Sequence, residues 1–507
     1  MKAWWKWALG MALAALPWLG GWGHPFLYDD VGMIAENAFL EEPGNWVLAA
    51  TGRTLLDPAV VNGRRPAVLA SYFLDRALHG LEPWGWRASS LLLHLGCVGL
   101  GAWLAKRLGA NGFVVAAFGW LFALHPALVE AVHAPGFRAD VLCQFWALGA
   151  MHGLLWAGGG SRRGLCLGLG CGALALLSKE TALALPLALG AAMGLYPDKF
   201  GATRRKRAAI WAAAAALAGG FFWIWAALPA ELQALGGSWN GESLGYPQAL
   251  YSAPYLWVRS WRWLVWPWPL NVVPGFEGVE TAFSWRFGVG ALGVALAGWA
   301  GWKMRRAERV GALGVAWAGA FFLPASNLLP LLHPVAERYL YPMAPGFALL
   351  LAAGLGRLPR RLGRVGLAAL AAAYAWGVAA RVGEWRSAEV LWETAMERNP
   401  KSAVAATWLG LLREEAGDAE GARALYAEAM RLNPWEAPAW INAGALAGKG
   451  GDLAEAERLL RRATEIRPGS ASAWNNLAAC LERQGRREEA AAALERAGVA
   501  GQGRPKP

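Results

Sequence analysis

The sequence is poor in cysteine and lacks the motifs of soluble nucleotide and metal enzymes. Only five of the 507 residues are cysteines; four lie within apolar segments (Cys97, Cys143, Cys166, Cys171) and Cys480 stands alone near the end. This excludes a disulfide framework, and the spacing fits no zinc site. No glycine-rich phosphate loop follows a predicted strand, so a soluble nucleotide donor is not expected.

Apolar segments, by contrast, dominate the first three quarters of the chain. Hydrophobic residues make up 56% of the sequence, and the 32 tryptophans are typical of membrane interfaces. Apolar runs recur near the length of about 20 residues that crosses a bilayer. The predicted spans are 4–22, 89–105, 112–129, 140–157, 164–178, 181–196, 208–228, 286–302, 310–326, 337–355 and 365–382.

Basic clusters predict the orientation of these spans. Lysine and arginine account for a net charge of +12, but they gather in short groups between apolar runs, which indicates a positive-inside membrane protein and not a nucleic-acid binder. With these groups in the cytoplasm the N-terminus is inside, eleven helices cross and the C-terminal tail is outside. Eleven spans agree with a cytoplasmic position of every basic cluster only if the tryptophan-rich stretch Tyr255 to Pro269 does not cross the membrane and instead lies in the interface or re-enters. Residues 4–22 lack a small-x-small cleavage site and are therefore expected to remain as the first helix.

The last quarter is a soluble helical repeat. Asn399-Pro400, Asn433-Pro434 and Arg467-Pro468 recur every 34 residues, with small residues at matching offsets between them. This is the tetratricopeptide period. The predicted organisation is a membrane domain (1–382), a lead-in half repeat (383–400), repeats (401–500) and a disordered tail (501–507). The fold class is therefore all-α, a polytopic helical bundle followed by an α-solenoid.

The residues with possible chemistry lie on the predicted outer face. Its loops are 23–88, 130–139, 229–285 and 327–336. Ionisable residues at a membrane boundary often face a functional cavity. Those singled out are Asp29, Asp30, Arg65, His125, Glu130, Arg138, Asp140, Lys179, Glu180, Glu337 and Arg338.

Simpler interpretations stay open for the same residues. Asp29-Asp30 also fits a helix-exit loop or an N-cap. Arg138 and Asp140, and Glu337 and Arg338, also fit structural ion pairs or local caps, and Lys179-Glu180 also fits a snorkelling pair at the interface. His125, Glu130 and His133 suggest a metal, but their spacing is not that of a zinc-binding helix and His125-Pro126 breaks the helix, so no metal is expected.

The order of the motifs resembles one family. F-L-Y-D-D is followed by R-R-P, P-W-G-W-R, L-F-A-L-H-P-A-L-V-E-A-V, G-F-R-A-D, L-S-K-E, P-A-S-N, E-R-Y-L-Y and then the repeats. This sequence is similar to the transmembrane and tetratricopeptide-repeat O-mannosyltransferases and their bacterial relatives, within the class C glycosyltransferases. It departs from them in having His-Ala-Pro before Gly-Phe-Arg138 and in its short repeat array.

The resemblance implies a polyprenyl-phosphate monosaccharide donor, bound at the outer membrane boundary, and no other cofactor. Asp29 or Asp30 would be the general base for an acceptor hydroxyl, with inversion at the anomeric carbon. Arg65, Arg138, Lys179 and Arg338 would hold the phosphate, supported by His125, Glu130, Asp140, Glu180 and Glu337.

The partners expected are the lipid-linked donor and an acceptor protein or envelope glycan held by the repeats, with no nucleic acid. The composition, rich in alanine, glycine, arginine and tryptophan, favours a bacterial inner membrane with the repeats in the periplasm. Two alternatives remain. A membrane-anchored scaffold would use the repeats alone. A flippase for lipid-linked sugars would need more charges near the middle of the bilayer.

Overall fold

The computed structural model describes residues 4–56, 60–201, 203–226, 245–328, 331 and 333–501. These residues form helices joined by turns, with no strand among them, so the all-α class is confirmed. The predicted tail falls outside this description except for its first residue, as do parts of three predicted outer loops (57–59, 227–244, and 329, 330 and 332).

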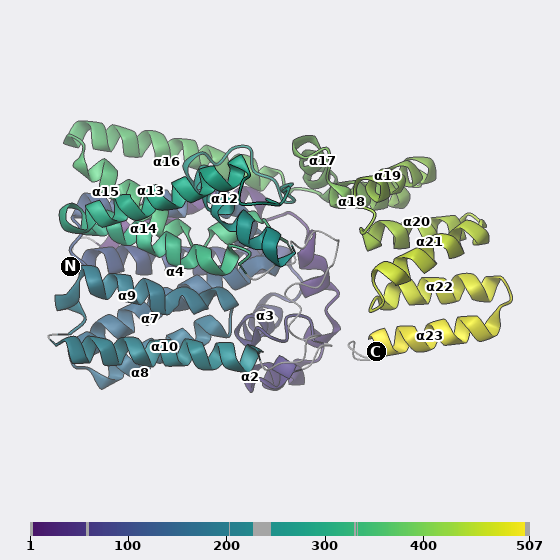
Figure 1. The fold of residues 1–507 in the computed structure, drawn as a ribbon, viewed down its shortest axis with the longest axis horizontal. Coiled ribbons are helices and arrows are strands. Elements are labelled where there is room, and N and C mark those ends of the chain that lie inside the picture. The colour runs from purple at the N-terminus through teal and green to yellow at the C-terminus, as the bar shows by residue number, and fades with distance from the viewer. Residues whose placement is uncertain are drawn as a thin grey trace.

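The first part of the chain is a bundle of long apolar helices that lie side by side (Figure 1). Its helices follow the predicted spans closely. They are α1 (Trp4–Ala15), α4 (Pro83–Arg107), α5 (Gly112–Ala123), α6 (Val129–His133), α7 (Arg138–Gly158), α8 (Arg162–Leu176), α9 (Leu185–Leu195), α10 (Arg204–Ala226), α12 (Tyr246–Val265), α13 (Trp285–Ala307), α14 (Arg309–Phe322), α15 (Ala344–Arg357) and α16 (Arg360–Gly383).

Four helices among the described residues are long and apolar enough to cross a membrane: Pro83–Arg107, Pro135–Gly158, Arg204–Ile224 and Arg360–Gly383. The pair Gly112–Ala123 and Pro126–His133, which bends by 54°, is either a fifth, broken span or a re-entrant loop. The bend falls at His125-Pro126, because proline cannot continue the hydrogen-bond ladder of the helix. Other apolar segments are shorter, and the count of eleven spans stays a prediction.

The tryptophan-rich stretch belongs to α12 from Tyr255 to Val265, and its last four residues follow the helix. α12 contains Pro254 and packs along α13. A bilayer is not part of the structure, so its expected place in the membrane interface also stays a prediction.

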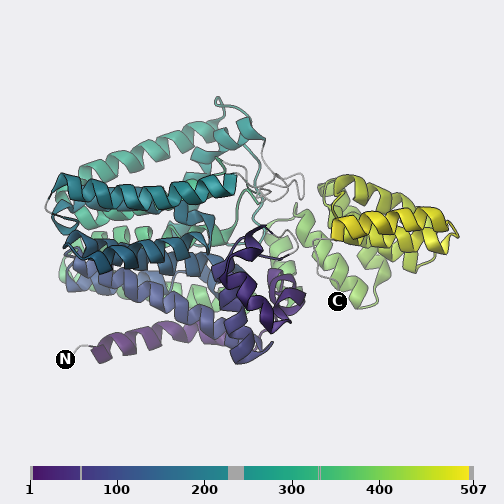
Figure 2. The same ribbon diagram turned by 90° about the horizontal axis from the view of Figure 1, so that it is seen from below.

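The segment between α1 and α4 gathers at one end of the bundle, next to the repeats (Figure 1, Figure 2). It contains short turns and two helices around a small apolar core, which includes Ile34 and Val68 of this segment and Trp86 of α4. The elements are η1 (Leu16–Gly21), η2 (Val31–Ala35), η3 (Ala38–Leu40), η4 (Pro43–Asn45), α2 (Trp46–Ala50), η5 (Arg53–Leu56) and α3 (Pro66–His79). The predicted carboxylate pair, Asp29 and Asp30, lies in this segment, directly before η2.

Seven helices form the C-terminal solenoid: α17 (Ala388–Arg398), α18 (Ala403–Glu415), α19 (Ala419–Leu432), α20 (Ala437–Lys449), α21 (Leu453–Ile466), α22 (Ala471–Arg483) and α23 (Arg487–Gly501). The periodic residues explain the pairing. Gly417, Gly451 and Gly485 adopt positive φ at the turns within each pair, where glycine is favoured. A Cβ atom at position 410 would lie 2.6 Å from the ring of Tyr426, so Gly410 leaves room for that ring. The predicted domain boundaries themselves are not tested.

Candidate functional site

The carboxylate pair begins a short π-helical turn, η2, at the end of the bundle that faces the repeats. Asp30 takes the N-cap position, as one alternative predicted, but its side chain makes no cap bond. Its Oδ1 instead accepts a hydrogen bond of 2.6 Å from the backbone N–H of Gly136. The Asp30 side chain is buried, whereas Asp29 is only half-buried. No hydrogen bond reaches the Asp29 carboxylate from any residue that the structure describes.

Both carboxyl groups have raised pKa values. Burial raises the pKa of Asp29 to about 6, although Arg338 opposes the shift and Glu130 adds to it. Burial raises the pKa of Asp30 to about 7. The hydrogen bond from Gly136 and the charge of Arg87 lower this pKa, whereas the charge of Asp29 raises it further. Asp29 is thus a half-buried carboxyl group with a pKa near neutral pH, which is the property of a general base.

Arg338 is held beside this carboxylate by α6. Its Nη1 lies 2.6 Å from Oε1 of Glu130, and its backbone N–H donates to the other oxygen of the same carboxylate. The guanidinium also covers the ring of Phe137, at 4.3 Å from the centroid. Two predicted site residues far apart in the sequence, Glu130 and Arg338, are therefore in contact.

Two further ion pairs join predicted site residues. Nζ of Lys179 lies 2.6 Å from Oδ2 of Asp140, and both side chains are buried. Nη2 of Arg65 lies 3.1 Å from Oε1 of Glu180. These pairs link α3, α7 and the turn η8 (Glu180–Ala184). Lys179 and Glu180 do not bind each other, because each has a different partner that is distant in the sequence. Their place at the membrane interface stays a prediction.

Arg138, one of the predicted phosphate partners, lies in a closed pocket. Its Nη2 is 2.5 Å from Oδ2 of Asp75, and it also donates to Ser90 and to the carbonyl of Trp86. The alternative pair Arg138–Asp140 was therefore wrong: the partner is Asp75, on α3. With 1% of its side chain exposed, Arg138 is already neutralised and inaccessible to a ligand.

Glu337 and His125 serve the packing of the bundle. Glu337 lies 2.9 Å from Arg381, at the end of α16, so the alternative pair with Arg338 was wrong. Nε2 of His125 is 2.8 Å from the carbonyl oxygen of Leu264, and its ring packs on Tyr374. Within the described ranges no group of three or more His, Cys, Asp or Glu residues could hold a metal ion.

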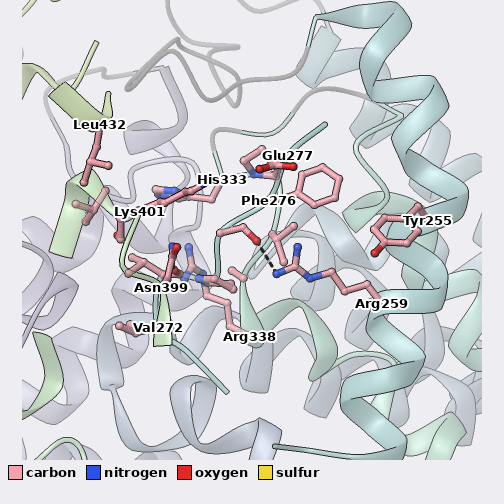
Figure 3. A pocket seen from close by; sticks show the side chains of 18 of the residues that line it. Tyr255, Arg259, Val272, Phe276, Glu277, His333, Arg338, Asn399, Lys401 and Leu432 are labelled. Carbon is pink, nitrogen blue, oxygen red and sulfur yellow. Dashed lines mark hydrogen bonds between the residues drawn. The ribbon is translucent and has the colours of Figure 1, made fainter. Parts of the chain in front are cut away.

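A cavity of about 570 Å³ lies between this end of the bundle and the repeats. Of the predicted site residues only Arg338 lines it, together with Tyr28, which precedes Asp29. The other lining residues that carry charge or polar groups were not predicted: Tyr255, Arg259, Glu277, Arg286, His333, Asn399, Lys401 and Ser402. Figure 3 shows Arg259 and Arg338 entering the cavity from different sides.

Arg259 differs from the predicted cations because no carboxylate pairs with it among the residues described. It donates to the carbonyl of Gly275 at 2.7 Å and lies over the ring of Trp263, 4.6 Å from the centroid. Arg286 lies 3.2 Å from the exposed carboxylate of Glu277. The cavity thus offers guanidinium groups to an anion. Arg259 lies within the tryptophan-rich stretch, which the sequence predicted to be an interfacial or re-entrant segment and not part of a site.

An apolar helical bundle, a carboxylate next to a cationic cavity, and a repeat array together define a membrane protein with a helical-repeat domain. Models of the tetratricopeptide repeat match residues 378–434 and 447–506, which confirms the repeats.

The chain is similar to two proteins named as O-mannosyl-transferases. It is 35% identical over 137 residues to Protein O-mannosyl-transferase tmtc2 of Xenopus laevis, covering 26% of this chain and 16% of that protein. It is 33% identical over 184 residues to Tmtc2 of Drosophila melanogaster, covering 34% of this chain and 20% of that protein. The resemblance predicted from the motifs is confirmed, and the matches span a fifth or less of each relative.

A solved structure also aligns along most of the chain. The crystal structure of ArnT from Cupriavidus metallidurans bound to undecaprenyl phosphate covers 93% of this chain and 81% of its own. The sequence identity is 18% and the TM-score is 0.43.

Proposed function

We propose that the protein is a membrane glycosyltransferase that moves a monosaccharide from a polyprenyl-phosphate donor to a hydroxyl group of an acceptor. The observation that carries the proposal is the half-buried carboxylate of Asp29, free of hydrogen bonds from the described residues and adjacent to a cavity lined by guanidinium groups. The similarity to O-mannosyl-transferases supports mannose as the first sugar to test. The lipid tail of such a donor stays in the bilayer, so no nucleotide pocket is needed.

Asp29 acts as the general base. Its carboxylate removes the proton of the acceptor hydroxyl as the hydroxyl oxygen bonds to the anomeric carbon. The bond from that carbon to the phosphate oxygen breaks, and the polyprenyl phosphate leaves with the electron pair. The reacting carbon passes through a state with oxocarbenium character, and attack from the face opposite the phosphate inverts its configuration.

The leaving phosphate is stabilised by Arg338 and Arg259, which both line the cavity. Guanidinium groups bind phosphate oxygens through paired, charge-assisted hydrogen bonds, and fixed cations stabilise charge that develops in the transition state. Glu130 orients Arg338 through two hydrogen bonds. Lys179 and Arg65 have a structural role in this proposal. Their ion pairs with Asp140 and Glu180 stabilise the part of the bundle next to the site. Arg138 takes no part in binding, because Asp75 and the surrounding rings enclose it.

The acceptor approaches from the outer face of the membrane, where the repeats also lie in the predicted topology. Tetratricopeptide arrays present extended binding surfaces to other proteins. We therefore place the acceptor, a protein or an envelope glycan, between the repeats and the cavity. A bacterial inner membrane, with the N-terminus in the cytoplasm, remains the predicted location.

The test is sugar transfer by the purified full chain in detergent. Radiolabelled polyprenyl-phosphate sugars, mannose first, are mixed with an envelope extract as the source of acceptors. Wild type is compared with Asp29→Asn and with Asp198→Asn, which removes an exposed carboxylate from η9 (Pro197–Lys199). Transfer by wild type and by the Asp198 variant, with loss in the Asp29 variant, is expected.

Two outcomes would contradict the proposal. Unchanged transfer by Asp29→Asn would remove Asp29 as the base. No transfer by wild type from any lipid-linked donor would favour the scaffold, whose repeats alone would carry the function.

A further inference from the structure

The loop that carries Asp29 is in direct contact with the first helices of the solenoid. The ring of Tyr28 stands edge-on to Trp392 of α17, with centroids 5.2 Å apart, and edge-on to Trp408 of α18 at 6.3 Å. The two indole rings stack on each other with an interplanar angle of 2°. Trp392 is buried and Trp408 is half-buried. We call Tyr28, Trp392 and Trp408 the aromatic clamp.

The clamp holds a backbone conformation that tyrosine rarely adopts. Tyr28 has a φ of +54°, in the left-handed region that disfavours residues with a Cβ atom. Such a conformation persists only where the surroundings fix it, and it is found most often at functional sites. The ring of Tyr28 also contacts Phe137 of the bundle, with centroids 5.8 Å apart. Tyr28 is therefore fixed by both the bundle and the repeats.

The same part of the solenoid closes the cavity. Asn399, Lys401 and Ser402, in the turn between α17 and α18, line the cavity together with Tyr28 and Arg338. Nδ2 of Asn399 donates to the carbonyl of Val273, another lining residue, at 3.2 Å. The first repeat is thus a wall of the site and not a module at a distance from it.

We infer, on the basis of the proposed transferase function, that Trp392 and Trp408 are positioning residues of the active site. They act through Tyr28 on Asp29. Because Asp29 directly follows Tyr28, a rotation of the Tyr28 backbone redirects the carboxylate. The repeat array therefore sets the direction of the base in addition to any role in holding the acceptor.

The clamp also affects the environment of the base. Titratable and charged groups from several elements act on Asp29 or on its neighbours Tyr28 and Asp30. They include Asp30 on the same loop, Tyr72 on α3, Glu130 on α6, Arg338 on η11 (Glu337–Leu340) and Glu436 at the start of α20. Burial is the largest cause of the raised pKa of Asp29. Removing the Trp408 ring admits water next to Tyr28 and should lower that pKa.

The experiment measures transfer by the full chain in detergent, with the lipid-linked donor that wild type accepts. Trp408→Ala is expected to lower kcat by about tenfold or more, since small displacements of a catalytic group are costly. KM for the donor should stay within about twofold, because the variant removes no group that contacts the phosphate, and the acid limb of the pH profile should move to lower pH. Trp408→Phe keeps an aromatic ring and should restore most of kcat.

The matched control is Trp474→Ala. Trp474 is a tryptophan of the same array whose Nε1 donates to the carbonyl of Pro468 and which does not contact Tyr28. The Trp474→Ala variant should have the kcat and the pH profile of the wild type. Equal losses in the two alanine variants would overturn the inference, as would an unchanged kcat and pH profile in Trp408→Ala.

A double-mutant cycle covers the case in which Trp408→Ala folds poorly. Trp408→Leu and Tyr28→Leu, which remove the rings but keep apolar bulk, are combined, and the inference expects non-additive effects on kcat because the two rings act as one unit. Additive effects would overturn it. If wild type transfers sugar and Asp29→Asn does not, while the Trp408 variants behave like the control, only the positioning role fails. If wild type transfers nothing, the proposed function fails as well.

Discussion

The charge of a single carboxylate, that of Asp29, should set the pH dependence of transfer. The pKa of Asp29 is raised by burial to about 6. A base works only when deprotonated, so kcat/KM should rise with pH through about 6 and level off about one unit above it. Initial rates between pH 4.5 and 8 test this. Asp29→Asn should lower the rate by roughly 10²- to 10⁴-fold, the usual contribution of a general base.

Asp30→Asn is the companion variant. The amide oxygen of asparagine can still accept the hydrogen bond from Gly136, so this variant should keep more activity than Asp29→Asn. Loss of transfer in Asp30→Asn, together with near-normal transfer in Asp29→Asn, would reverse the two assignments.

Gly136 supplies a second prediction for this site. A Cβ atom on Gly136 would lie 2.9 Å from Oδ1 of Asp30 and 3.2 Å from the backbone carbon of Asp29, closer than packed atoms allow. Gly136→Ala should therefore displace the carboxylate pair and lower kcat by about tenfold or more. The rate is compared with that of Gly354→Ala, where a Cβ meets nothing within 4 Å. Equal rates in the two variants would contradict the close packing of Gly136 on the loop.

Sequence motifs identified several ionisable residues of this end of the bundle but not their partners. Asp140 pairs with Lys179, and Glu130 with Arg338, across 39 and 208 positions. Such pairings depend on how helices pack, which composition and spacing do not contain. Arg138 was expected to bind phosphate because it stands in a motif, yet Asp75, outside every motif, neutralises it.

Helix packing in the bundle depends on glycines where α7 meets α8. A Cβ atom on Gly153 would lie 2.4 Å from the backbone nitrogen of Gly168 and 2.9 Å from the carbonyl oxygen of Gly164. Gly164 and Gly168 are four residues apart, the spacing that lets membrane helices approach closely.

Gly153→Leu should force these two helices apart. Overpacking of this kind typically costs about 1–3 kcal/mol of stability. The melting temperature in detergent should fall, relative to Gly170→Leu on the open side of α8, where a Cβ meets nothing within 4 Å. Equal melting temperatures would contradict the contact.

Most helices could be predicted from the sequence, because apolar runs and basic clusters mark their limits. The predicted span 140–157 is α7 (Arg138–Gly158), and 365–382 lies within α16 (Arg360–Gly383). The predicted span 112–129 is interrupted at His125-Pro126, where the structure bends by 54°. Periodicity shows that a helix exists, but the angle at a proline depends on its neighbours.

The arrangement of the whole molecule could not be predicted. The repeats were expected as a module that holds the acceptor, whereas α17 and α18 pack on the bundle (Figure 2). The turn between these two helices lines the cavity. A network of charges accompanies this contact. Arg381, at the end of α16, lies 2.9 Å from Glu337 and also pairs with Glu384, and Arg398 of α17 lies 2.8 Å from Glu384.

Removing the central cation should weaken the contact between the two parts of the molecule, because Arg381 holds Glu384, which in turn binds Arg398 of α17. Arg381→Met would leave Glu337 with no cation and Glu384 with Arg398 alone, and breaking a buried pair in this way costs about 3–5 kcal/mol. We expect a lower melting temperature and faster proteolysis in the turn between α16 and α17. Transfer should fall as well, because the wall formed by the first repeat would leave the cavity.

Arg361→Met, at the opposite, exposed end of the same helix, is the matched control. The double variant Arg381→Met, Glu337→Leu removes one buried carboxylate along with the cation, so it should be more stable than Arg381→Met alone. A double variant no more stable than Arg381→Met would mean that the cost comes from lost packing and not from unpaired charge. An Arg381→Met protein as stable and active as the control would show that the Arg398–Glu384 pair and the aromatic and hydrogen-bond contacts hold the repeats to the bundle without Arg381.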